Sequence, residues 1–492
     1  MKSLEQHFSR FRDNIVGNRQ KFMTQYGEQR IVYADWTASG RLYEPIERRM
    51  LEHFGPFVGN THSEANVTGT SMTQAYRKAH DVIKKHVHAG PNDVLLFVGF
   101  GMTAAINKLQ RILGLKIPEQ VRPYVSLQEE LKPVVFVTHM EHHSNHTTWY
   151  ETMADVHVLK PTVEGTVDLD DLRELLQQYR HRKFKIGSFT ACSNVTGVET
   201  PYREMARIMH ENGGVCFVDF AASAPYVSID MHPADPMEKL DAVILSPHKF
   251  LGGPGTSGVL LFDSKLYQLQ SPDQPGGGTV LWTNPWGKYR FHPNIEIRED
   301  GGTPGFLQAV KAALAVELKE EMGTEKMRAR EEEMVSKIFN SLREIPGVHI
   351  LADGLSNRLP IVSFFIDNVH YNLIVKLLND RFGIQVRGGC SCAGTYGHYL
   401  LHVDRFTSKR ITDRIDEGDL SSKPGWVRMS IHPTTTDEET DFILDAIRQI
   451  QKSSKSWERD YTYDAHMNEY RNRNDNGSIQ NAVEEWFDLS EE

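Results

Sequence analysis

The stretch AVILSPHKFLGGPGTSGVLLF, residues 242–262, decides the fold of this chain. It opens with a short apolar run, turns through Ser246, His248 and Lys249, and reaches a second apolar run after a glycine-rich segment. Runs this short are typical of buried strands rather than helices. We therefore expect two strands, with Lys249 in the turn after the first. Alone, Ser-x-His-Lys is a weak pattern, because a lysine after a strand is usually a solvated loop residue.

Comparable apolar runs precede this stretch, and a polar or glycine-containing segment follows each of them. They cover residues 94–98, 134–138, 185–190 and 215–218. Strands that alternate with helices indicate β-α-β units and a mostly parallel sheet, and therefore an α/β fold. Such folds bind ligands at the carboxyl ends of their strands, which is where the chemically interesting residues of this chain fall.

Changes in composition and in the pattern of apolar residues divide the chain into four parts. They are an N-terminal helical segment (1–30), a large domain (31–315), a small α+β domain (316–455) and a polar tail (456–492). We expect the tail to be a surface extension or partly disordered. The small domain should contain short strands at 348–351, 361–365 and 425–431.

Two segments between these parts stand out by composition. Residues 265–300 are rich in Pro, Gly and Trp and are interpreted as a long functional loop. Residues 306–342 are dominated by Ala, Glu and Lys, which predicts a long helical stretch leading into the small domain.

The overall composition excludes several classes of protein. With 39% hydrophobic and 24% charged residues, the 492-residue chain is ordinary for a soluble globular protein. Its net charge is −10 and its basic runs are short, so we expect no nucleic-acid partner. It has no apolar stretch long enough for a membrane span and no secretion signal. Four cysteines do not make a disulfide framework, which favours a cytoplasmic location.

Lys249 and its neighbours suit the chemistry of pyridoxal 5′-phosphate (PLP). This cofactor needs a lysine amine for a Schiff base and hydroxyl, imidazole or amide donors for its phosphate. Ser246 and His248 supply such donors beside Lys249. Asp219, at the end of an upstream apolar run, could keep the pyridine nitrogen protonated. The alternative for Asp219 is a helix N-cap, since Asp often lies at strand–helix junctions.

The segment FVGFGMTAAINKL, residues 97–109, predicts a strand, a glycine turn and the start of a helix. Backbone amides at that helix N-terminus, around Gly101, Met102 and Thr103, can form a phosphate cradle. The same pattern also occurs in a simple tight turn.

The segment VTHMEHHSNHTTW, residues 137–149, is rich in histidine. A histidine placed after the strand could stack on the cofactor ring and transfer protons to the substrate. Histidines at 139, 142, 143 and 146 also raise the possibility of a metal site. No acidic or cysteine ligand pattern accompanies them, so we expect no metal.

These segments follow the order and rough distances found in cysteine desulfurases of the group that includes selenocysteine lyases. MEHHSNHTTW resembles that family's EHH-N segment, and LSPHKFLGGPGTSGVL resembles its S-x-HK…GP-G-G segment. Further matches are the S-N-V-x-G motif with Asn194, the triple glycine at 276–278 and the GTP segment with Thr303. The resemblance implies the class V aminotransferase type of PLP-dependent fold type I. That fold has a large domain with a mostly parallel seven-stranded sheet and a smaller α+β domain.

The resemblance also implies a role for each matching residue. Lys249 would be the Schiff-base lysine and proton shuttle, and His142 the ring-stacking acid–base residue. Asp219 would pair with the pyridine nitrogen, and Asn194 would contact the phenolic oxygen or the substrate. Arg428 would bind the substrate carboxylate, for which a bidentate guanidinium is suited; otherwise it would be read as a surface arginine. The phosphate would be held by Gly101, Met102, Thr103, Ser246, His248 and, across a dimer interface, Thr303.

The segment GIQVRGGCSCAGTYGH bears on the reaction. In the desulfurases an arginine lies five positions before the cysteine that attacks the substrate's sulfur, and Arg387 and Cys392 have this spacing. Arg387, also expected at the substrate, would favour the nucleophilic thiolate. The Cys390-x-Cys392 pair also resembles the R-x-G-C-x-C loop of the desulfurase-like domain of molybdenum cofactor sulfurases. An inert buried pair or part of a zinc site are the alternatives.

The chain departs from the desulfurase pattern at several positions. Ala222 replaces a glutamine that hydrogen-bonds the phenolic oxygen, Trp36 places an indole by the expected entrance, and Met102 replaces a hydroxyl residue. Insertions enlarge loops at about 115–132, 281–297 and 398–424. These differences leave the substrate open.

We therefore predict a homodimeric cysteine desulfurase-like enzyme that acts through Lys249 and a persulfide on Cys392. It would take sulfur or selenium from an L-cysteine-type amino acid, with a possible sulfur-acceptor protein. Alternatives with the same cofactor are an aminotransferase, a β-lyase, an epimerase and a kynureninase-like hydrolase. A non-catalytic protein on the same fold is the third possibility, against which the joint presence of Lys249, Asp219, His142 and Arg428 argues.

Overall fold

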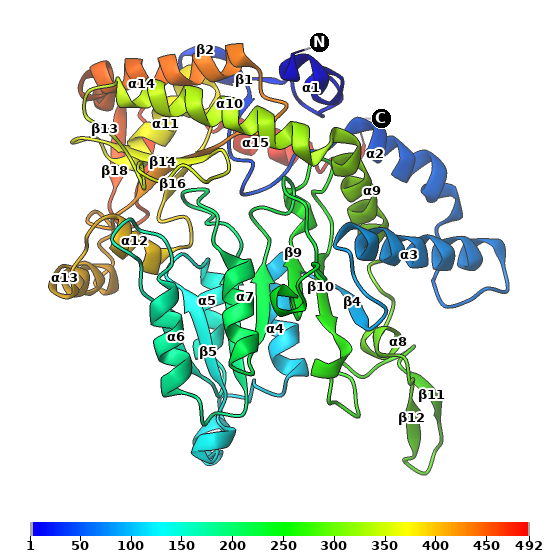
Figure 1. Ribbon diagram of the computed structural model, residues 1–492. Helices are drawn as coiled ribbons and strands as arrows, with labels where there is room; N and C mark the ends of the chain where they lie inside the picture. The colour runs from blue at the N-terminus through cyan, green and yellow to red at the C-terminus, as the bar shows by residue number, and fades with distance from the viewer. Residues whose placement is uncertain (1–2, 491–492) are drawn as a thin grey trace.

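The central element of the structure, a computed structural model that describes residues 3–490, is a seven-stranded sheet (Figure 1). Its strand order is β4-β10-β9-β8-β7-β5-β6. The strands are β4 (Asp93–Val98), β5 (Val134–Thr138), β6 (Asp155–Leu159), β7 (Lys185–Thr190), β8 (Val215–Asp219), β9 (Ala242–Leu245) and β10 (Gly258–Asp263). All neighbours are parallel except β10, which runs antiparallel to both β4 and β9. The prediction of an α/β fold with a mostly parallel seven-stranded sheet is confirmed.

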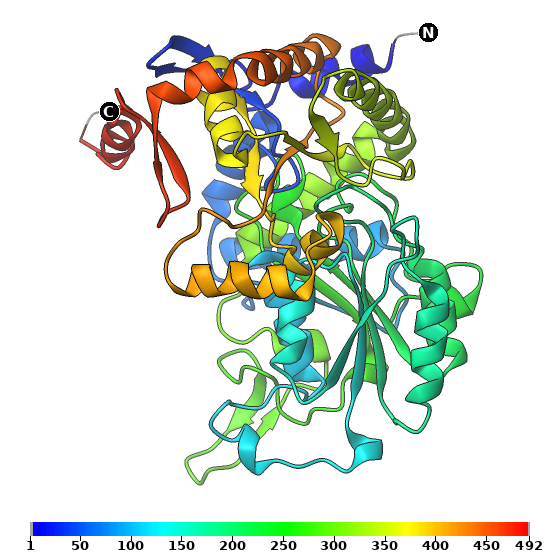
Figure 2. The ribbon, with the colours of Figure 1, turned by 90° about the vertical axis from the view of Figure 1, so that its left-hand side faces the viewer.

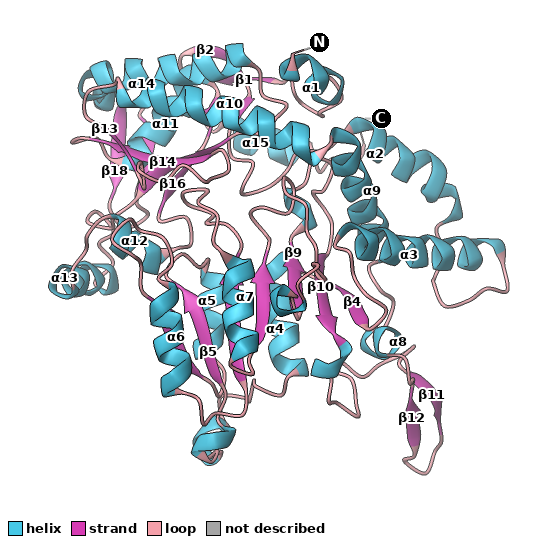
Figure 3. Cartoon of the chain, in the orientation of Figure 1, coloured by secondary structure: helices cyan, strands magenta, loops and turns pink. Residues whose placement is uncertain are grey.

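Helices cover both faces of this sheet, which explains why its strands are continuous apolar runs. Successive residues of a strand point to opposite faces. In β5, Val135 and Val137 pack with α4 and α5 residues, whereas Val134 and Phe136 pack with α6 and α7 residues. The covering helices are α4 (Gly101–Ile112), α5 (His143–Tyr150), α6 (Leu169–Gln178) and α7 (Tyr202–Glu211). Figure 3 shows the strands enclosed between these helices.

A second, antiparallel sheet forms the core of the small domain, in the order β13-β14-β17-β16. Its strands are β13 (Val348–Ile350), β14 (Ile361–Ile366), β17 (Trp426–Ser430) and β16 (Arg387–Gly389). The three predicted strands are present within a few residues. Strand β16, with the sequence RGG, was not predicted because it has no apolar alternation. The helices that pack on this sheet are α10 (Thr324–Arg343), α11 (Tyr371–Phe382) and α14 (Asp437–Trp457).

The long helical stretch predicted at 306–342 is two helices rather than one. They are α9 (Phe306–Met322) and α10, separated by Gly323. Gly323 has φ +83°, a conformation that costs glycine little and interrupts a right-handed helix. Helix α9 packs along α3 (Val67–His86) of the large domain, so the break lets the chain turn into the small domain.

The N-terminal segment is helical only at its start, in α1 (Leu4–Arg12). A hairpin of β1 (Lys21–Thr24) and β2 (Gly27–Arg30) replaces the expected connector. The next strand, β3 (Val32–Tyr33), pairs in parallel with β15 (Ile384–Gln385) beside the small domain. The start of the segment that was predicted as the large domain thus pairs with the small domain.

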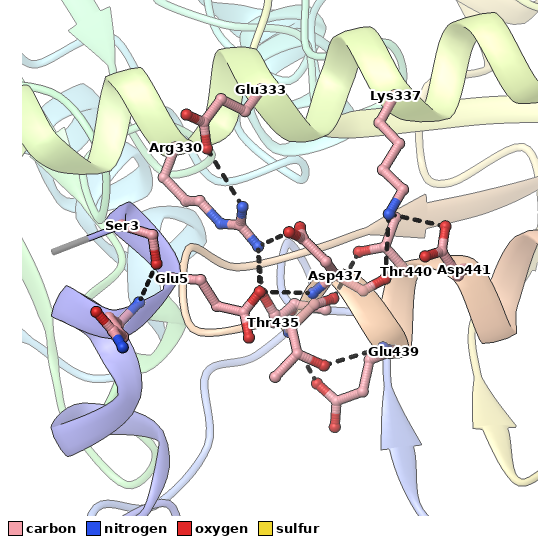
Figure 4. Close-up of polar contacts among 12 residues, drawn as sticks. Ser3, Glu5, Arg330, Glu333, Lys337, Thr435, Asp437, Glu439, Thr440 and Asp441 are labelled. Atoms are coloured by element: carbon pink, nitrogen blue, oxygen red, sulfur yellow. Dashed lines mark hydrogen bonds and ion pairs between the residues drawn. The ribbon is translucent and has the colours of Figure 1, made fainter.

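Arg330 of α10 fastens the N-terminal helix to α14, as Figure 4 shows. Its guanidinium donates to the backbone oxygen of Thr435 at 3.1 Å and to Asp437 at 2.8 Å. The Asp437 amide in turn donates to the Glu5 carboxylate at 3.2 Å. Arg330 is 3% exposed, so these contacts are needed to satisfy a buried charge.

The C-terminal part, predicted as a polar tail, contains ordered elements (Figure 2). Strands β18 (Tyr461–Asp464) and β19 (Glu469–Asn472) form a hairpin against α11, and α15 (Ser478–Glu485) follows. Tyr461 is buried, and its hydroxyl donates to Asp380 at 3.1 Å. Within residues 3–490, no helix is long and apolar enough to span a membrane.

The predicted loop at 265–300 holds a projecting hairpin of β11 (Val280–Thr283) and β12 (Tyr289–Phe291), followed by α8 (Ile295–Glu299) (Figure 1). The remaining helices are α2 (Glu44–Arg49), α12 (Gly394–Leu400) and α13 (Arg405–Asp416).

Candidate active site

A cavity of about 190 Å³ lies at the carboxyl ends of the central strands, where the small domain meets them. This is the edge at which α/β sheets bind ligands. The structure brings most of the predicted site residues together there. The predicted residues that line it are Met102, Thr103, His142, Asn194, Asp219, Ser246, His248, Lys249, Arg387, Cys392 and Arg428.

Lys249 lies in a short 3-10 turn directly after β9, and Asp219 is the last residue of β8. Burial lowers the pKa of Lys249 to about 8, with Arg428 and Arg387 adding to the shift and Asp219 opposing it. Burial raises the pKa of Asp219 to about 6, although the Ala221 amide donates to its Oδ1 at 2.8 Å. Perturbed groups of opposite type at the end of a cavity are typical of catalytic sites.

The first turn of α4 forms an anion cradle with Ser246 and His248. The Met102 amide donates to Ser246 Oγ at 2.9 Å, and Gly101 has φ +59°. A Cβ at Gly101 would lie 2.8 Å from His248 Cε1, so only glycine fits there. Thr103 Oγ1 and Ser144 Oγ share a hydrogen bond of 2.6 Å at the same end of the cavity. Backbone amides and hydroxyls converging on a helix N-terminus suit a phosphate.

His142 caps α5 and lies on the wall of the cavity. Its Nδ1 accepts a hydrogen bond from the Ser144 amide at 3.1 Å, which fixes the ring. Burial, reinforced by the nearby charge of Lys249, lowers the pKa of His142 to about 3. The imidazole is therefore neutral at neutral pH and can accept or relay a proton.

Glu141, which the sequence analysis did not single out, accepts hydrogen bonds from residues around this turn. Its Oε1 accepts from the Thr138 hydroxyl at 2.7 Å and from the Thr190 amide at 2.8 Å, and Oε2 accepts from Asn145 at 2.8 Å. The side chain is 2% exposed, and burial raises its pKa to about 8. It ties the ends of β5 and β7 together beneath His142.

The other histidines of this segment point elsewhere. His139 is buried against Tyr396 and Tyr399, and His146 contacts Tyr150. Across residues 3–490, no three His, Cys, Asp or Glu side chains converge as metal ligands would. Cys192 and Cys216 are buried, and burial raises both thiol pKa values well above their usual range.

Cys392 lies in a loop of the small domain that is fastened to the large domain. Asn194 Nδ2 donates to the Ser391 oxygen at 2.7 Å, and the His143 amide donates to the Cys392 oxygen at 2.8 Å. Ser391 and Cys392 have φ +52° and +57°, a left-handed pair that is strained for residues other than glycine. The thiol-bearing residue is exposed at the cavity, whereas Cys390 is half-buried.

Arg387 and Arg428 face each other across the pair β16 and β17, so they lie on the same face of the small sheet. Both guanidinium groups contact one carboxylate, Asp35: Arg428 Nη2 at 2.7 Å and Arg387 Nε at 3.3 Å. Arg428 Nη1 also donates to the Asn194 backbone oxygen at 3.1 Å. Arg428 is only 3% exposed, which excludes the reading of it as a surface residue.

Apart from Gly101, which lies against Ser246 and His248 without lining the cavity, Thr303 is the predicted site residue that the structure does not place there. It lies on an exposed loop, where its Oγ1 donates to Asn60 at 3.3 Å. The triple glycine packs beside the same loop, and the Gly302 amide donates to the Gly277 oxygen at 2.8 Å.

Several further lining residues were not assigned a role from the sequence, because their side chains carry no charge. They are Thr37, Ala38, Phe100, Ser144, Thr190 and Ala221. Ala222, which replaces the family's glutamine, also lines the cavity. Trp36 was expected by the entrance, which is wrong: it is 4% exposed and stacks on His432 with ring centroids 4.2 Å apart.

Comparison with known proteins now identifies the class. The family model for class-V aminotransferases matches residues 32–443, so the chain belongs to this family, whose members are PLP-dependent enzymes. A probable cysteine desulfurase of Halalkalibacterium halodurans is 27% identical over 371 residues, covering 74% of this chain and 84% of that protein. One of Halobacterium salinarum is 26% identical over 380 residues, covering 74% and 83%.

Solved structures agree on the fold. The apo cysteine desulfurase of Thermococcus onnurineus has a TM-score of 0.71 at 21% identity, covering 90% of this chain and 98% of that one. An Escherichia coli cysteine desulfurase in an S-sulfonic acid form has a TM-score of 0.69 at the same identity and coverage. The predicted PLP-dependent transferase fold type I is confirmed, as is the prediction of an enzyme.

The residues of the cavity fit PLP. Asn194 Oδ1 and Thr37 Oγ1 are buried and find no hydrogen-bond partner among residues 3–490, although their residues line the cavity. Unsatisfied buried polar atoms of this kind are costly unless a ligand completes them. The first turn of α4 with Ser246 and His248, the Lys249 amine and the buried Asp219 carboxylate are the groups that would meet the cofactor's phosphate, aldehyde and ring nitrogen.

Proposed function

We propose that this protein is a PLP-dependent cysteine desulfurase-like enzyme that transfers the sulfur of an L-cysteine-type amino acid to Cys392. The observation that carries the proposal is the placement of Lys249, Asp219 and Cys392 on the walls of one cavity. A simple aminotransferase would need the first two residues but would have no use for a thiol held beside them. The relatives named probable cysteine desulfurases support the same activity.

In this proposal the large domain holds the cofactor. Lys249 would bind it covalently, Asp219 would pair with its ring nitrogen, and His142 would lie against its ring. Thr103, Ser246, His248 and the first-turn amides of α4 would hold its phosphate. When bound, PLP withdraws electrons from the substrate's amino-bearing carbon and so weakens the neighbouring bonds.

Lys249 and His142 are the residues placed to move protons. The pKa of about 8 leaves part of the Lys249 amines neutral at neutral pH, so this side chain can take a proton from the substrate and return it. Neutral His142 lies on the same cavity wall and can relay a second proton.

Cys392 would act as the nucleophile toward sulfur. Its thiolate attacks the substrate's sulfur, the S–S bond forms, and the Cβ–S bond breaks with its electron pair going to Cβ. Cβ then takes a proton, so that L-cysteine and the Cys392 thiol give L-alanine and a persulfide. The left-handed loop and its bonds to Asn194 and His143 position the thiol for this attack.

We further infer a homodimer in which Thr303 of one subunit reaches the phosphate of the other. Thr303 lies outside its own cavity on an exposed loop, as such a role requires. Exposed apolar side chains are available to a second copy, among them Leu51 after α2, Val67 at the start of α3 and Phe100 at the cavity. A protein thiol in the cytoplasm is the fitting acceptor, since a reducing compartment keeps Cys392 reduced.

The test is to incubate the purified holoenzyme with L-cysteine and a reducing thiol and to measure alanine and sulfide. We expect equal amounts of both. The Cys392→Ser variant should lose at least about a hundredfold in rate, because a hydroxyl cannot accept the sulfur. The control Cys390→Ser should keep most of the activity. No alanine from the wild type, or full activity of Cys392→Ser, would refute the sulfur transfer.

A further inference from the structure

Asp35 forms ion pairs with Arg387 and Arg428, two residues that line the cavity, but does not line the cavity itself. Its Oδ1 contacts Arg428 and its Oδ2 contacts Arg387, so one carboxylate bridges both guanidinium groups. We propose that Asp35 is a specificity-determining residue, which limits the site to amino acids with a single acidic group. The inference rests on the proposed function only in that the cavity binds an amino acid.

The donors that Asp35 leaves free suit one carboxylate. Arg387 uses Nε on Asp35, and its two Nη groups make no hydrogen bond within residues 3–490. Arg428 uses Nη2 on Asp35 and Nη1 on Asn194, and its Nε is buried without a partner in the same residues. A planar pair of free Nη donors is the geometry that a single carboxylate accepts in bidentate fashion.

The charges of the residues around Asp35 also favour a substrate with a single acidic group. Arg387 and Arg428 carry two positive charges, and Asp35 cancels one of them. His142 and His248 are neutral at neutral pH, because burial lowers their pKa values to about 3 and about 4. Of the two arginine charges, one is therefore left without a carboxylate partner within residues 3–490. A second acid group on the substrate would enter the cavity without a partner charge, which disfavours its binding.

The backbone at Asp35 is held by contacts other than those of its carboxylate with the arginines. Its residue bridges to Ser430 at the end of β17, whose Oγ accepts from the Thr37 amide at 2.9 Å. The Tyr33 hydroxyl also donates to the Asp35 backbone oxygen at 3.2 Å. The backbone at Asp35 is therefore held by contacts that do not involve the arginine side chains.

The test compares the binding of L-alanine with that of L-aspartate, one acid group against two. Each is titrated into the purified holoenzyme and followed by calorimetry and by the visible absorption of the bound cofactor. In Asp35→Asn, the preference for L-alanine over L-aspartate should shift about tenfold or more toward L-aspartate, since one uncompensated charge is added nearby. Asp35→Glu, which keeps the charge, should stay close to the wild type.

A merely structural role for Asp35 would weaken both ligands alike and leave their ratio unchanged. The exposed Asp445 on α14 provides a control, and Asp445→Asn should bind both amino acids like the wild type. A ratio in Asp35→Asn within twofold of the wild-type value would overturn the proposal, as would binding of neither amino acid by the wild type. If alanine release from L-cysteine fails but the ratio shifts, only the desulfuration falls and the role of Asp35 stands.

Discussion

The two walls of the cavity are built differently. The wall that would hold the cofactor consists of Lys249, Asp219 and His142, which follow strands of one sheet and have strongly shifted pKa values. The opposite wall brings Arg387 and Cys392 from the small domain, and these residues are exposed. The groups that would hold the cofactor lie at the ends of the strands of one sheet. The groups that would meet the substrate, Cys392 among them, come from a second domain, and a few hydrogen bonds hold their loop to the large domain.

Removing Lys249 should have the largest effect on activity, because this residue is the central group of the cofactor wall. Lys249→Ala deletes both the covalent attachment and the proton carrier, so alanine formation from L-cysteine should fall by at least about a thousandfold. The measurement is the steady-state rate together with the visible absorption of the purified protein. Lys265→Ala, an exposed residue in the 3-10 turn that follows β10, is the control and should behave like the wild type. Retention of more than a tenth of the activity would contradict the role of Lys249.

A substitution in the second wall should act on binding more than on chemistry. Arg428→Lys keeps the charge but loses the fork that meets Asp35 and Asn194, so the KM for L-cysteine should rise about tenfold to a hundredfold. The value of kcat should change much less. Arg410→Lys on the exposed α13 is the matched control. A fall in kcat at unchanged KM would show that Arg428 acts in the chemical step rather than in substrate binding.

The smallest expected effect is on the pH dependence of covalent PLP binding, which tests the lowered pKa of Lys249. Only the neutral amine of Lys249 can attach PLP, and its pKa is lowered from 10.5 to about 8. The rate at which the cofactor-free protein binds PLP covalently should therefore rise about tenfold per pH unit below pH 8 and level off above it. Asp219 opposes the lowering, so Asp219→Asn should move the plateau to lower pH. A rate in the wild type that keeps rising to pH 10 would show an unperturbed lysine.

The sequence predicted the first wall almost completely, and the reason is physical. Short apolar runs such as 242–245 mark buried strands, and the residue after a parallel strand must lie at one edge of the sheet. Lys249 and Asp219 could thus be assigned to one site before their distance was known. The missed residue on this wall, Glu141, acts through hydrogen bonds beneath the surface that no local pattern reveals.

The second wall was less predictable because its parts are far apart in the chain. The position of Asp35 against Arg387 and Arg428 depends on the pairing of β3 with β15 and of residue 35 with Ser430, which no local pattern encodes. Trp36 was misplaced for the same reason, since its stacking on His432 is a long-range contact. The predicted role of Thr303 depends on a second subunit. Distances within one chain therefore do not test it.

The most direct test of the central claim is borohydride reduction of the purified protein, followed by digestion and mass spectrometry. Reduction fixes the bond between a lysine and PLP as a stable pyridoxyl group. We expect this group on the peptide that contains Lys249 and nowhere else in the chain. A pyridoxyl group on another lysine, or none on a protein purified in the presence of PLP, would contradict it.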